Sequence, residues 1–333
     1  MREIRQSDDS FSRAGAALAA LGPWPAGSRV ALAASGGADS TFLALAWRAF
    51  AATKDGLETQ VWIVDHGHRP GTALAAARAL AQYRALDLPA AVLRVGTAAA
   101  PGSAAGGAAG GETDLRERRY AALFAAAREW GASVLLTAHH ADDLAETVLL
   151  RLLRGTGLRG LAGIPARRAA GPAAPGLELR RPLLGLRAAA IRAALRAAGQ
   201  PWLEDPTNAD PAAAARNRLR QVLWPALATL ATGDPVAAVL RLAGEAAEWN
   251  ECLETLLAAA ADWRALPGYL RRQAVAGALR GLGATVSPAR LLDLEGALLA
   301  RGSAAVDAAH RLSIAGGPLR VHVRGATGKQ AVR

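Results

Sequence analysis

The first half of the chain alternates between short apolar runs and longer amphipathic or Ala-rich stretches. The short runs predict buried strands over 29–34, 60–64, 90–95 and 133–137. The stretches between and after them predict helices over 41–52, 72–86, 112–130 and 141–154. This alternation indicates a doubly wound parallel α/β sheet, in which a ligand binds beyond the carboxyl ends of the strands.

The second half of the chain has mainly helical periodicity. It predicts helices over 185–199, 211–231, 235–260, 267–282 and 286–301, and a small β element around 312–314 and 319–323. We therefore expect an α/β domain over 1–182 and a smaller, mainly helical region over 183–333, with 210–230 as the alternative boundary. The Gly/Ala segment 96–111 predicts a flexible surface loop.

Charge and cysteine content narrow the class of protein. The 333 residues include 39 Lys+Arg and 28 Asp+Glu, a net charge of +11 that favours a polyanionic partner such as nucleic acid. The single cysteine, Cys252, excludes a disulfide framework or a cysteine-held metal cluster supplied by this chain alone. The polar start is unlike a signal peptide, and no apolar run is long enough to span a bilayer. We expect a cytoplasmic protein.

The segment Ser35-Gly36-Gly37-Ala38-Asp39-Ser40 lies between a predicted strand and a predicted helix. Two glycines allow a sharp turn, and the helix N-terminus adds N–H donors and a positive dipole, which together suit a phosphate. Asp39 can hold a Mg²⁺ that neutralises such phosphates. No Lys-Ser/Thr follows the glycines, so this is not a Walker A loop. The alternative is an ordinary glycine-rich turn.

A second polar motif, 139–147, follows the fourth predicted strand and opens a helix. Asp143 and Glu146 are three residues apart and share a helical face. Together with Asp142, these carboxylates suit Mg²⁺ or a cationic amine, and His139 or His140 suits a phosphate contact or a proton transfer. The alternative is helix capping by Asp142 beside a core histidine.

Arginines recur near both motifs. Arg116 and Arg119 share a helical face beside Tyr120, and a pair of guanidinium groups suits phosphate or carboxylate recognition. Arg151 and Arg154 end a helix before Gly155, where cations also favour the helix dipole. Arg216 and Arg220 belong to a further basic segment that suits an RNA backbone. A solvated charged face explains each of these arginines nearly as well.

Residues 35–40 resemble the SGGxDS signature of the PP-loop (N-type) ATP pyrophosphatase family. Further motifs in this order are similar to the branch of that family that forms lysidine in tRNA. They are Asp65-His66-Gly67-x-Arg69, Arg116-x-x-Arg119-Tyr120, His139-His140-Ala141-Asp142-Asp143-x-x-Glu146-Thr147, Arg151-x-x-Arg154-Gly155-Thr156-Gly157-Leu158, Pro182-Leu183-Leu184, 202–208 and Arg216-Asn217-x-x-Arg220. The resemblance covers about residues 29–225, and His68 and the 96–111 segment depart from the family pattern.

The resemblance implies an ATP- and Mg²⁺-dependent enzyme. It would ligate free L-lysine to C2 of the wobble cytidine in the CAU anticodon of tRNA(Ile), through an adenylated cytidine, with release of pyrophosphate and AMP. The implied roles are ATP binding by Ser35, Gly36, Gly37, Asp39, Ser40, Asp65 and His66, catalysis by Asp39, His139, Asp143 and Glu146, Mg²⁺ binding by Asp39 and Asp142, and substrate or tRNA contact by Arg116, Arg119, Tyr120, Arg151, Arg154, Gly155, Arg216 and Arg220. The region 183–333 would then contact tRNA. The oligomeric state stays open, with a homodimer as one option.

Three rival functions remain. A PP-loop tRNA thiolase would typically use paired cysteines, and this chain has only Cys252. Amide-forming PP-loop synthetases lack the combination of the 139–147 motif with the Arg154-Gly155-Thr156-Gly157 turn. A non-catalytic nucleotide-binding module would bind ATP without releasing pyrophosphate.

Overall fold

The computed structural model describes residues 2–67, 71–95, 112–204, 215–282, 284, 287–307, 310–314 and 317–323. The loop predicted at 96–111 and the second half of the 202–208 motif lie outside these ranges. The chain divides into two compact units, Met1–Gly244 and Glu245–Arg333. The division by role at 182 stays a prediction.

The first unit is built on a six-stranded sheet in the order β3-β2-β1-β4-β6-β5. Its strands are β1 Arg29–Ala34, β2 Glu58–Asp65, β3 Ala90–Arg94, β4 Val134–Thr137, β5 Arg167–Ala169 and β6 Glu178–Arg180. All neighbours pair in parallel except β5, which runs antiparallel to β6 at the edge. The chain moves outward from β1 to β2 and β3, and then returns to the other side of β1 with β4. The gap between the carboxyl ends of β1 and β4 is therefore the switch point of the sheet, where a ligand is expected.

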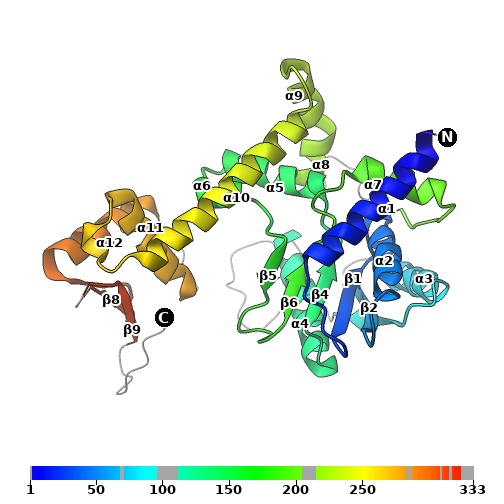
Figure 1. Cartoon of the computed structure of the whole chain (residues 1–333), viewed down its shortest axis with the longest axis horizontal. Helices are drawn as coiled ribbons and strands as arrows, with labels where there is room; N and C mark the ends of the chain where they lie inside the picture. The colour runs from blue at the N-terminus through cyan, green and yellow to red at the C-terminus, as the bar shows by residue number, and fades with distance from the viewer. Residues whose placement is uncertain are drawn as a thin grey trace. The chain divides into compact units, whose positions relative to one another are not determined.

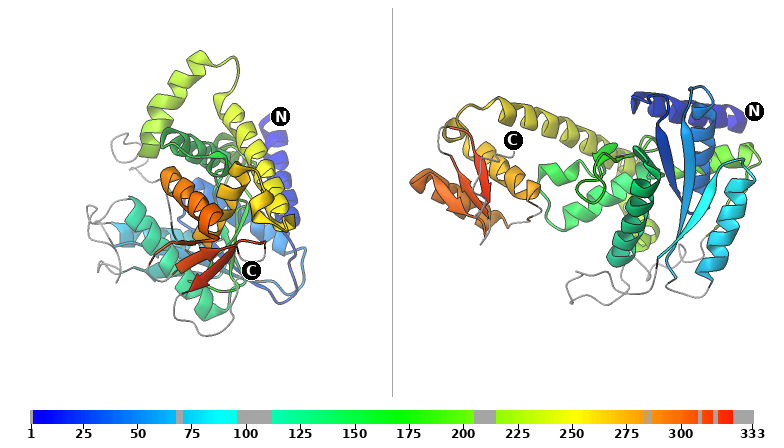
Figure 2. Two further views of the ribbon diagram at one scale, coloured as in Figure 1. Left: turned by 90° about the vertical axis from the view of Figure 1, so that its left-hand side faces the viewer. Right: turned by 90° about the horizontal axis from the view of Figure 1, so that it is seen from below.

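Helices cover both faces of this sheet (Figures 1 and 2). Up to residue 204, the helices of the first unit are α1 Arg2–Ala20, α2 Ala38–Ala51, α3 Thr72–Arg84, α4 Glu112–Trp130, α5 Ala141–Leu153, α6 Leu158–Leu161 and α7 Ala188–Ala197. Val30 and Leu32 of β1 pack with α1, α2, α3 and α7 in one core, whereas Ala31 and Ala33 pack with α4 in another. This split follows from the alternation of side chains along a strand. The predicted parallel α/β fold is confirmed.

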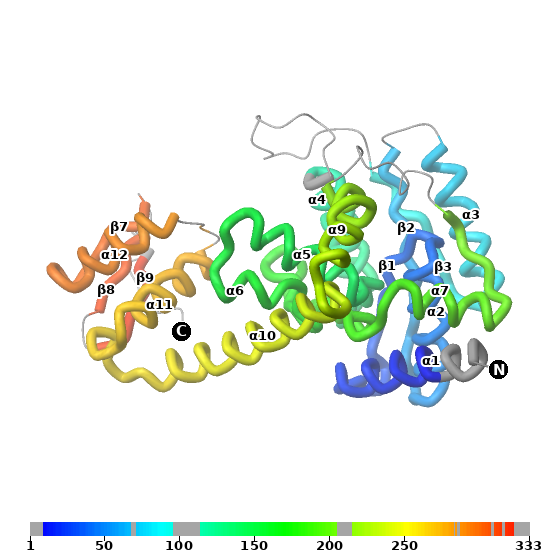
Figure 3. The backbone as a smooth tube through the Cα atoms, turned by 90° about the horizontal axis from the view of Figure 1, so that it is seen from above, coloured from blue at the N-terminus to red at the C-terminus, as the bar shows by residue number. Residues whose placement is uncertain are grey.

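A helical segment follows this sheet domain along the chain. It consists of α8 Ala215–Arg218, a π-helix η2 over Leu219–Leu223, α9 Trp224–Leu230 and α10 Pro235–Ala259. In Figure 3, α10 runs as one continuous helix through the position where the two compact units divide. No single described helix is long and apolar enough to cross a membrane. The helical stretch 215–230 and α10 reach that length and hydrophobicity only when they are taken together, and they are bent by 92° relative to each other.

The second unit has its own core. It contains the 3-10 helix η3 Trp263–Ala265, α11 Gly268–Gly281, α12 Pro288–Arg301 and the antiparallel sheet β7 Ser303–Ala305, β8 His310–Ser313 and β9 Arg320–Val323. Trp263, Val275, Leu279, Leu294 and Leu298 are buried together. The small β element predicted near the end of the chain is confirmed, with β7 as an additional strand.

Candidate active site

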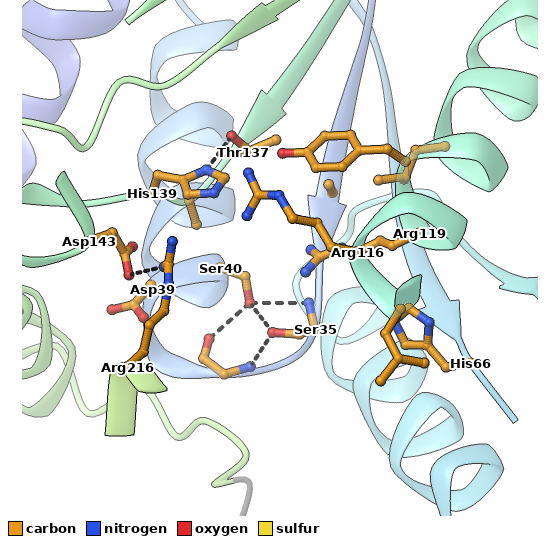
Figure 4. A pocket seen from close by; sticks show the side chains of 16 residues that line it. Ser35, Asp39, Ser40, His66, Arg116, Arg119, Thr137, His139, Asp143 and Arg216 are labelled. Atoms are coloured by element: carbon orange, nitrogen blue, oxygen red, sulfur yellow. Dashed lines mark hydrogen bonds and ion pairs between the residues drawn. The ribbon is translucent and has the colours of Figure 1, made fainter. Parts of the chain in front are cut away.

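The loop after β1 turns sharply onto α2 (Figure 4). Gly36 has φ +84°, and a Cβ atom there would lie 2.7 Å from Leu203 Cδ1, so only glycine fits. The Leu203 N–H donates to the Gly36 carbonyl at 2.9 Å. Because a trans peptide points its C=O and N–H in opposite directions, this bond turns the Gly37 N–H away from Leu203. Gly37 is the N-cap of α2, and its own N–H donates to Ser35 Oγ at 3.4 Å. The helix N-terminus that faces a ligand is therefore the first turn of α2, which starts at Ala38.

The two serines of this loop are held by a buried tyrosine. Tyr83 of α3 donates its hydroxyl to Ser40 Oγ at 3.0 Å and accepts from the Gly36 N–H at 3.2 Å. Ser40 Oγ donates to the Gly37 carbonyl at 3.0 Å and lies 3.3 Å from Ser35 Oγ. Burial raises the pKa of Tyr83, which keeps the phenol protonated and able to donate. No motif in the sequence points to this tyrosine.

A cavity of about 370 Å³ opens beside this loop, at the switch point of the sheet. Most predicted site residues line it. Those lining it are Ser35, Gly37, Asp39, Ser40, His66, Arg116, Arg119, Tyr120, His139, Asp143 and Arg216, with Thr137, Leu115 and Leu123 among the others. The cavity thus joins the loop after β1, the end of β2, one face of α4 and the start of α5, which are far apart in the sequence.

Arginines and a neutral histidine form one wall of the cavity. Arg116 lies over the Tyr120 ring, 5.4 Å from its centroid, and Arg119 lies one turn farther along α4. His139 Nδ1 lies 2.9 Å from Thr137 Oγ1. Burial, followed by the charges of Arg181, Arg116, Arg119 and Arg216, lowers the pKa of His139 to about 2. His139 is therefore neutral near pH 7, so it can offer a hydrogen bond to a phosphate but carries no positive charge.

Carboxylates form the opposite wall. His140 is the N-cap of α5 in a capping box, in which its N–H donates to Asp143 Oδ2 at 3.1 Å and its Nδ1 accepts from the Asp143 N–H at 3.4 Å. Its Nε2 lies 3.6 Å from Asp39 Oδ2 and 3.4 Å from Asp143 Oδ2. Burial lowers the pKa of His140, but the carboxylates of Asp39, Asp143 and Asp142 outweigh it and raise the pKa overall. His140 thus ties together the two carboxylates that line the cavity.

Asp39 is the residue best placed to hold a cation. Its Oδ1 is buried and has no hydrogen-bond partner, while its Oδ2 faces His140. A buried carboxylate oxygen without a donor is suited to a metal ion. The described residues contain no group of three or more His, Cys, Asp or Glu side chains that could hold a metal by themselves. Mg²⁺ commonly takes one or two protein carboxylates and completes its shell with phosphates and water, so Asp39 could supply one such ligand.

Asp142, the other predicted metal ligand, accepts hydrogen bonds from the start of α7 with both of its carboxylate oxygens. Its Oδ1 accepts from Arg187 Nε at 2.8 Å, and its Oδ2 accepts from the Ala188 N–H at 2.7 Å. Ala188 is the first residue of α7, so Asp142 caps that helix and joins it to α5. Asp142 does not line the cavity, and its role as a metal ligand stays a prediction.

Glu146 lies behind Asp143 and is only 1% exposed. Arg220 holds it through two hydrogen bonds, Nε to Oε1 at 2.5 Å and Nη2 to Oε2 at 2.9 Å. Arg220 Nη2 also donates to Asp143 Oδ1 at 3.2 Å, and Arg216 Nη1 lies 3.7 Å from the same oxygen. Burial raises the pKa of Glu146, although Arg220 opposes the shift. The predicted acidic pair is therefore present, but guanidinium groups from the basic segment 215–223 already contact it.

Four other predicted site residues do not line the cavity. Asp65 is buried and accepts from the Gly67 N–H at 3.1 Å, which stabilises the turn after β2. Arg151 donates to the carbonyls of Gly160 and Gly163 at 3.0 and 2.7 Å and so fixes the turn after α5. Arg154 is the exposed C-cap of α5, and Gly155 has φ +78°. Their assigned roles in ATP, substrate or tRNA contact stay predictions.

Arg181 is a charged neighbour of the site that the sequence does not single out, because it lies within a broadly basic stretch. It is 4% exposed, donates to the Pro165 carbonyl at 2.7 Å and has a buried Nε without a hydrogen-bond partner. Burial lowers its pKa, and a hydrogen bond with Tyr120 opposes this effect. Arg181 thus adds positive charge close to Tyr120 and His139.

Comparison of the chain with known proteins identifies related sequences and a matching family. A family model described as "PP-loop domain" matches residues 12–227. A tRNA(Ile)-lysidine synthase of Methylobacterium nodulans is 40% identical over 325 residues, covering 92% of this chain and 90% of that protein. The tRNA(Ile)-lysidine synthase of Salinispora tropica is 48% identical over 200 residues, covering 60% of this chain and 56% of that protein. The chain therefore spans little more than half the length of some of its relatives.

One similar solved structure supports the fold. The U34-tRNA thiolase NcsA of Methanococcus maripaludis, described with its [4Fe-4S] cluster, has a TM-score of 0.56 and 14% identity, covering 72% of this chain and 78% of that chain. At this identity the likeness concerns the fold alone. The single cysteine of the present chain, Cys252, is exposed on α10 and does not line the cavity.

Proposed function

This chain belongs to the tRNA(Ile)-lysidine synthase family of PP-loop proteins, and on that premise we propose that it ligates lysine to the wobble cytidine of tRNA(Ile). ATP would adenylate O2 of the cytidine in the CAU anticodon, with release of pyrophosphate. The lysine ε-amine would then form a bond to C2, with release of AMP and formation of lysidine. The observation that carries this proposal is a single cavity with a phosphate-binding loop, an arginine wall and a carboxylate wall.

The loop and the arginines suit the first step. The N–H groups at the start of α2 can donate to the departing pyrophosphate, and Arg116 and Arg119 can stabilise the charge that develops on the α-phosphate. His139, held neutral, can donate a hydrogen bond to a phosphate oxygen from the same wall. Asp39 would hold Mg²⁺, which when bound neutralises phosphate charge.

The carboxylate wall suits the second step. Asp143 lines the cavity and can attract the ε-ammonium group of lysine, with Glu146 behind it. Only the neutral amine is a nucleophile, so a proton must leave before the bond to C2 forms, and a carboxylate of this pair is the nearby acceptor. The Arg-rich segment 215–223 supports contact with tRNA phosphates.

The test is a paired assay with ATP, Mg²⁺ and labelled lysine. We expect pyrophosphate release and lysine incorporation with CAU-anticodon tRNA(Ile), and neither with CAU-anticodon tRNA(Met). Asp143→Asn should reduce lysine incorporation at least about 100-fold, because removing one electrostatic group of an active site commonly has such an effect. Pyrophosphate release without lysine transfer would contradict the proposed nucleophile, and ATP binding without any pyrophosphate release would favour a nucleotide-binding module.

A further inference from the structure

The acidic pair that the proposed function assigns to the lysine ammonium group is already bound by a cation of the chain itself. Glu146 is buried, and both of its oxygens accept from Arg220. The same guanidinium group reaches Asp143 Oδ1 at 3.2 Å. A two-point contact between guanidinium and carboxylate is among the stronger hydrogen-bonded pairs in proteins. A free lysine would therefore have to compete with Arg220 for these carboxylates.

We propose that Arg220 is an internal competitor for the lysine ammonium group, which holds the acidic pair until tRNA draws the segment 215–223 away. This proposal rests on the proposed function, because it takes the acidic pair as the amine site. It goes beyond it by giving the two substrates an order, in which tRNA binds first and lysine second. The amine site would then be blocked whenever no tRNA is bound.

Burial of Glu146 makes the exchange of cations cooperative. A buried carboxylate that loses its partner without replacement is strongly destabilised. Departure of Arg220 is therefore unfavourable unless another cation takes its place, and the lysine ammonium group is such a cation. Conversely, the ammonium group of lysine gains little binding free energy at these carboxylates while Arg220 still contacts them. Each event favours the other, which is the condition for coupling between two ligands.

The segment that carries Arg220 is suited to such a movement. Leu219–Leu223 is a π-helix between two short α-helices, and single π-turns of this kind are frequently functional. Asn217 and Leu219 are buried and anchor the segment, whereas Arg218 and Arg220 are less enclosed. The arginines of this segment lie close together in the sequence, and the phosphates of a bound tRNA offer them an alternative set of anions.

The experiment measures lysine binding with and without tRNA, and AMP replaces ATP so that no turnover occurs. For the wild type we expect tRNA(Ile) to raise the affinity for L-lysine at least about tenfold. In Arg220→Gln, lysine should bind at least about tenfold more tightly without tRNA than it binds to the wild type, and tRNA should add less than about threefold. The control is Arg84→Gln, at an exposed position of α3 outside this segment, which should retain the coupling of the wild type.

Two outcomes would overturn the proposal. One is a wild type that binds lysine equally well with and without tRNA. The other is an Arg220→Gln protein whose coupling equals that of Arg84→Gln. If Arg220→Gln does not fold, Arg220→Lys serves instead, because one ammonium group cannot replace the two-point contact; it should show reduced coupling, and unchanged coupling would contradict the proposal. Lysine incorporation by the wild type with ATP tests the proposed function separately, since the binding experiment needs no catalysis.

Discussion

His139 and His140 are adjacent, yet their environments shift their pKa values in opposite directions. His139 lies on the arginine side of the cavity, where burial and positive charge keep it neutral. His140 lies among Asp39, Asp142 and Asp143, whose charges raise its pKa against the effect of burial. The sequence identifies both histidines as candidates for phosphate contact or proton transfer, but the choice between them depends on which charges surround each ring. Asp142 and Asp143 belong to the same motif as the histidines, but the other charges come from α2, α4, α8 and the chain after β6, so the local pattern alone could not separate the two rings.

The low pKa of His139 predicts a loss of stability on acidification. The unfolded chain protonates this histidine near pH 6.5, whereas the folded protein, with a pKa of about 2, does not. The free energy of unfolding should therefore fall as pH drops below about 6.5, by about 2 kcal/mol between about pH 7.5 and pH 5. Urea unfolding of the wild type and of His139→Gln at both pH values measures this effect. An equal loss in the two proteins would contradict it.

At the scale of elements, periodicity predicts most of the α/β core but misses its edge. The strands near 29–34, 60–64 and 90–95 and the helices at 112–130 and 141–154 agree with the structure within a few residues. The hairpin of β5 and β6 escapes prediction, because each strand has three residues and neither alternates clearly. Helix α1 escapes it too; its start is polar, and its buried face rests on Ala14 and Leu18 against α2 and α7.

Ion pairs of Glu178 link the two strands of the edge hairpin, β5 and β6. Glu178 of β6 accepts from Arg167 of β5 at 2.8 and 3.1 Å and from Arg180 at 2.7 Å. The hydrogen bond with Arg167 lowers the pKa of Glu178, burial opposes this, and Arg180 lowers it further. The stabilisation is thus present above the unfolded pKa and is lost as pH falls through the folded pKa.

Glu178→Gln should lower the free energy of unfolding by about 1 kcal/mol at pH 7, as expected for a partly exposed pair. The difference from the wild type should disappear as pH falls through the lowered pKa of Glu178, because both side chains are neutral below it. Denaturant unfolding across this range provides the measurement, with Glu129→Gln at an exposed position of α4 as the matched control. A difference that persists at low pH would show that packing, not charge, stabilises the hairpin.

At the scale of the whole molecule, the chain consists of two compact units with separate cores. The family model covers residues 12–227, so the second unit lies outside the PP-loop match. The sequence pattern puts the change of character near 182, because helices dominate from that point. The sequence does not predict the boundary at Gly244, because α10 continues through it as one helix. Only the packing of the residues before and after this position divides the two units.

Separate cores predict separate unfolding transitions. Trp47, 0% exposed, belongs to the core of the first unit, and Trp263, 2% exposed, to that of the second. Each Trp→Ala change should cost about 3 to 5 kcal/mol. Calorimetry should therefore show two transitions, with Trp263→Ala lowering one and Trp47→Ala the other. If both substitutions lower the same transition, the two units unfold as one.

The two walls of the cavity also act on a molecule before it touches either of them. Arginines on one side and carboxylates on the other set up an electric field across the space between α4 and the start of α5. A substrate with separated charges would experience a torque in that field, with its anionic end drawn toward Arg116 and Arg119 and its cationic end toward the carboxylate side once Arg220 no longer covers Asp143. The capping of α5 by His140 fixes one side of this field within the fold itself, so part of the orientation is already set when the substrate arrives.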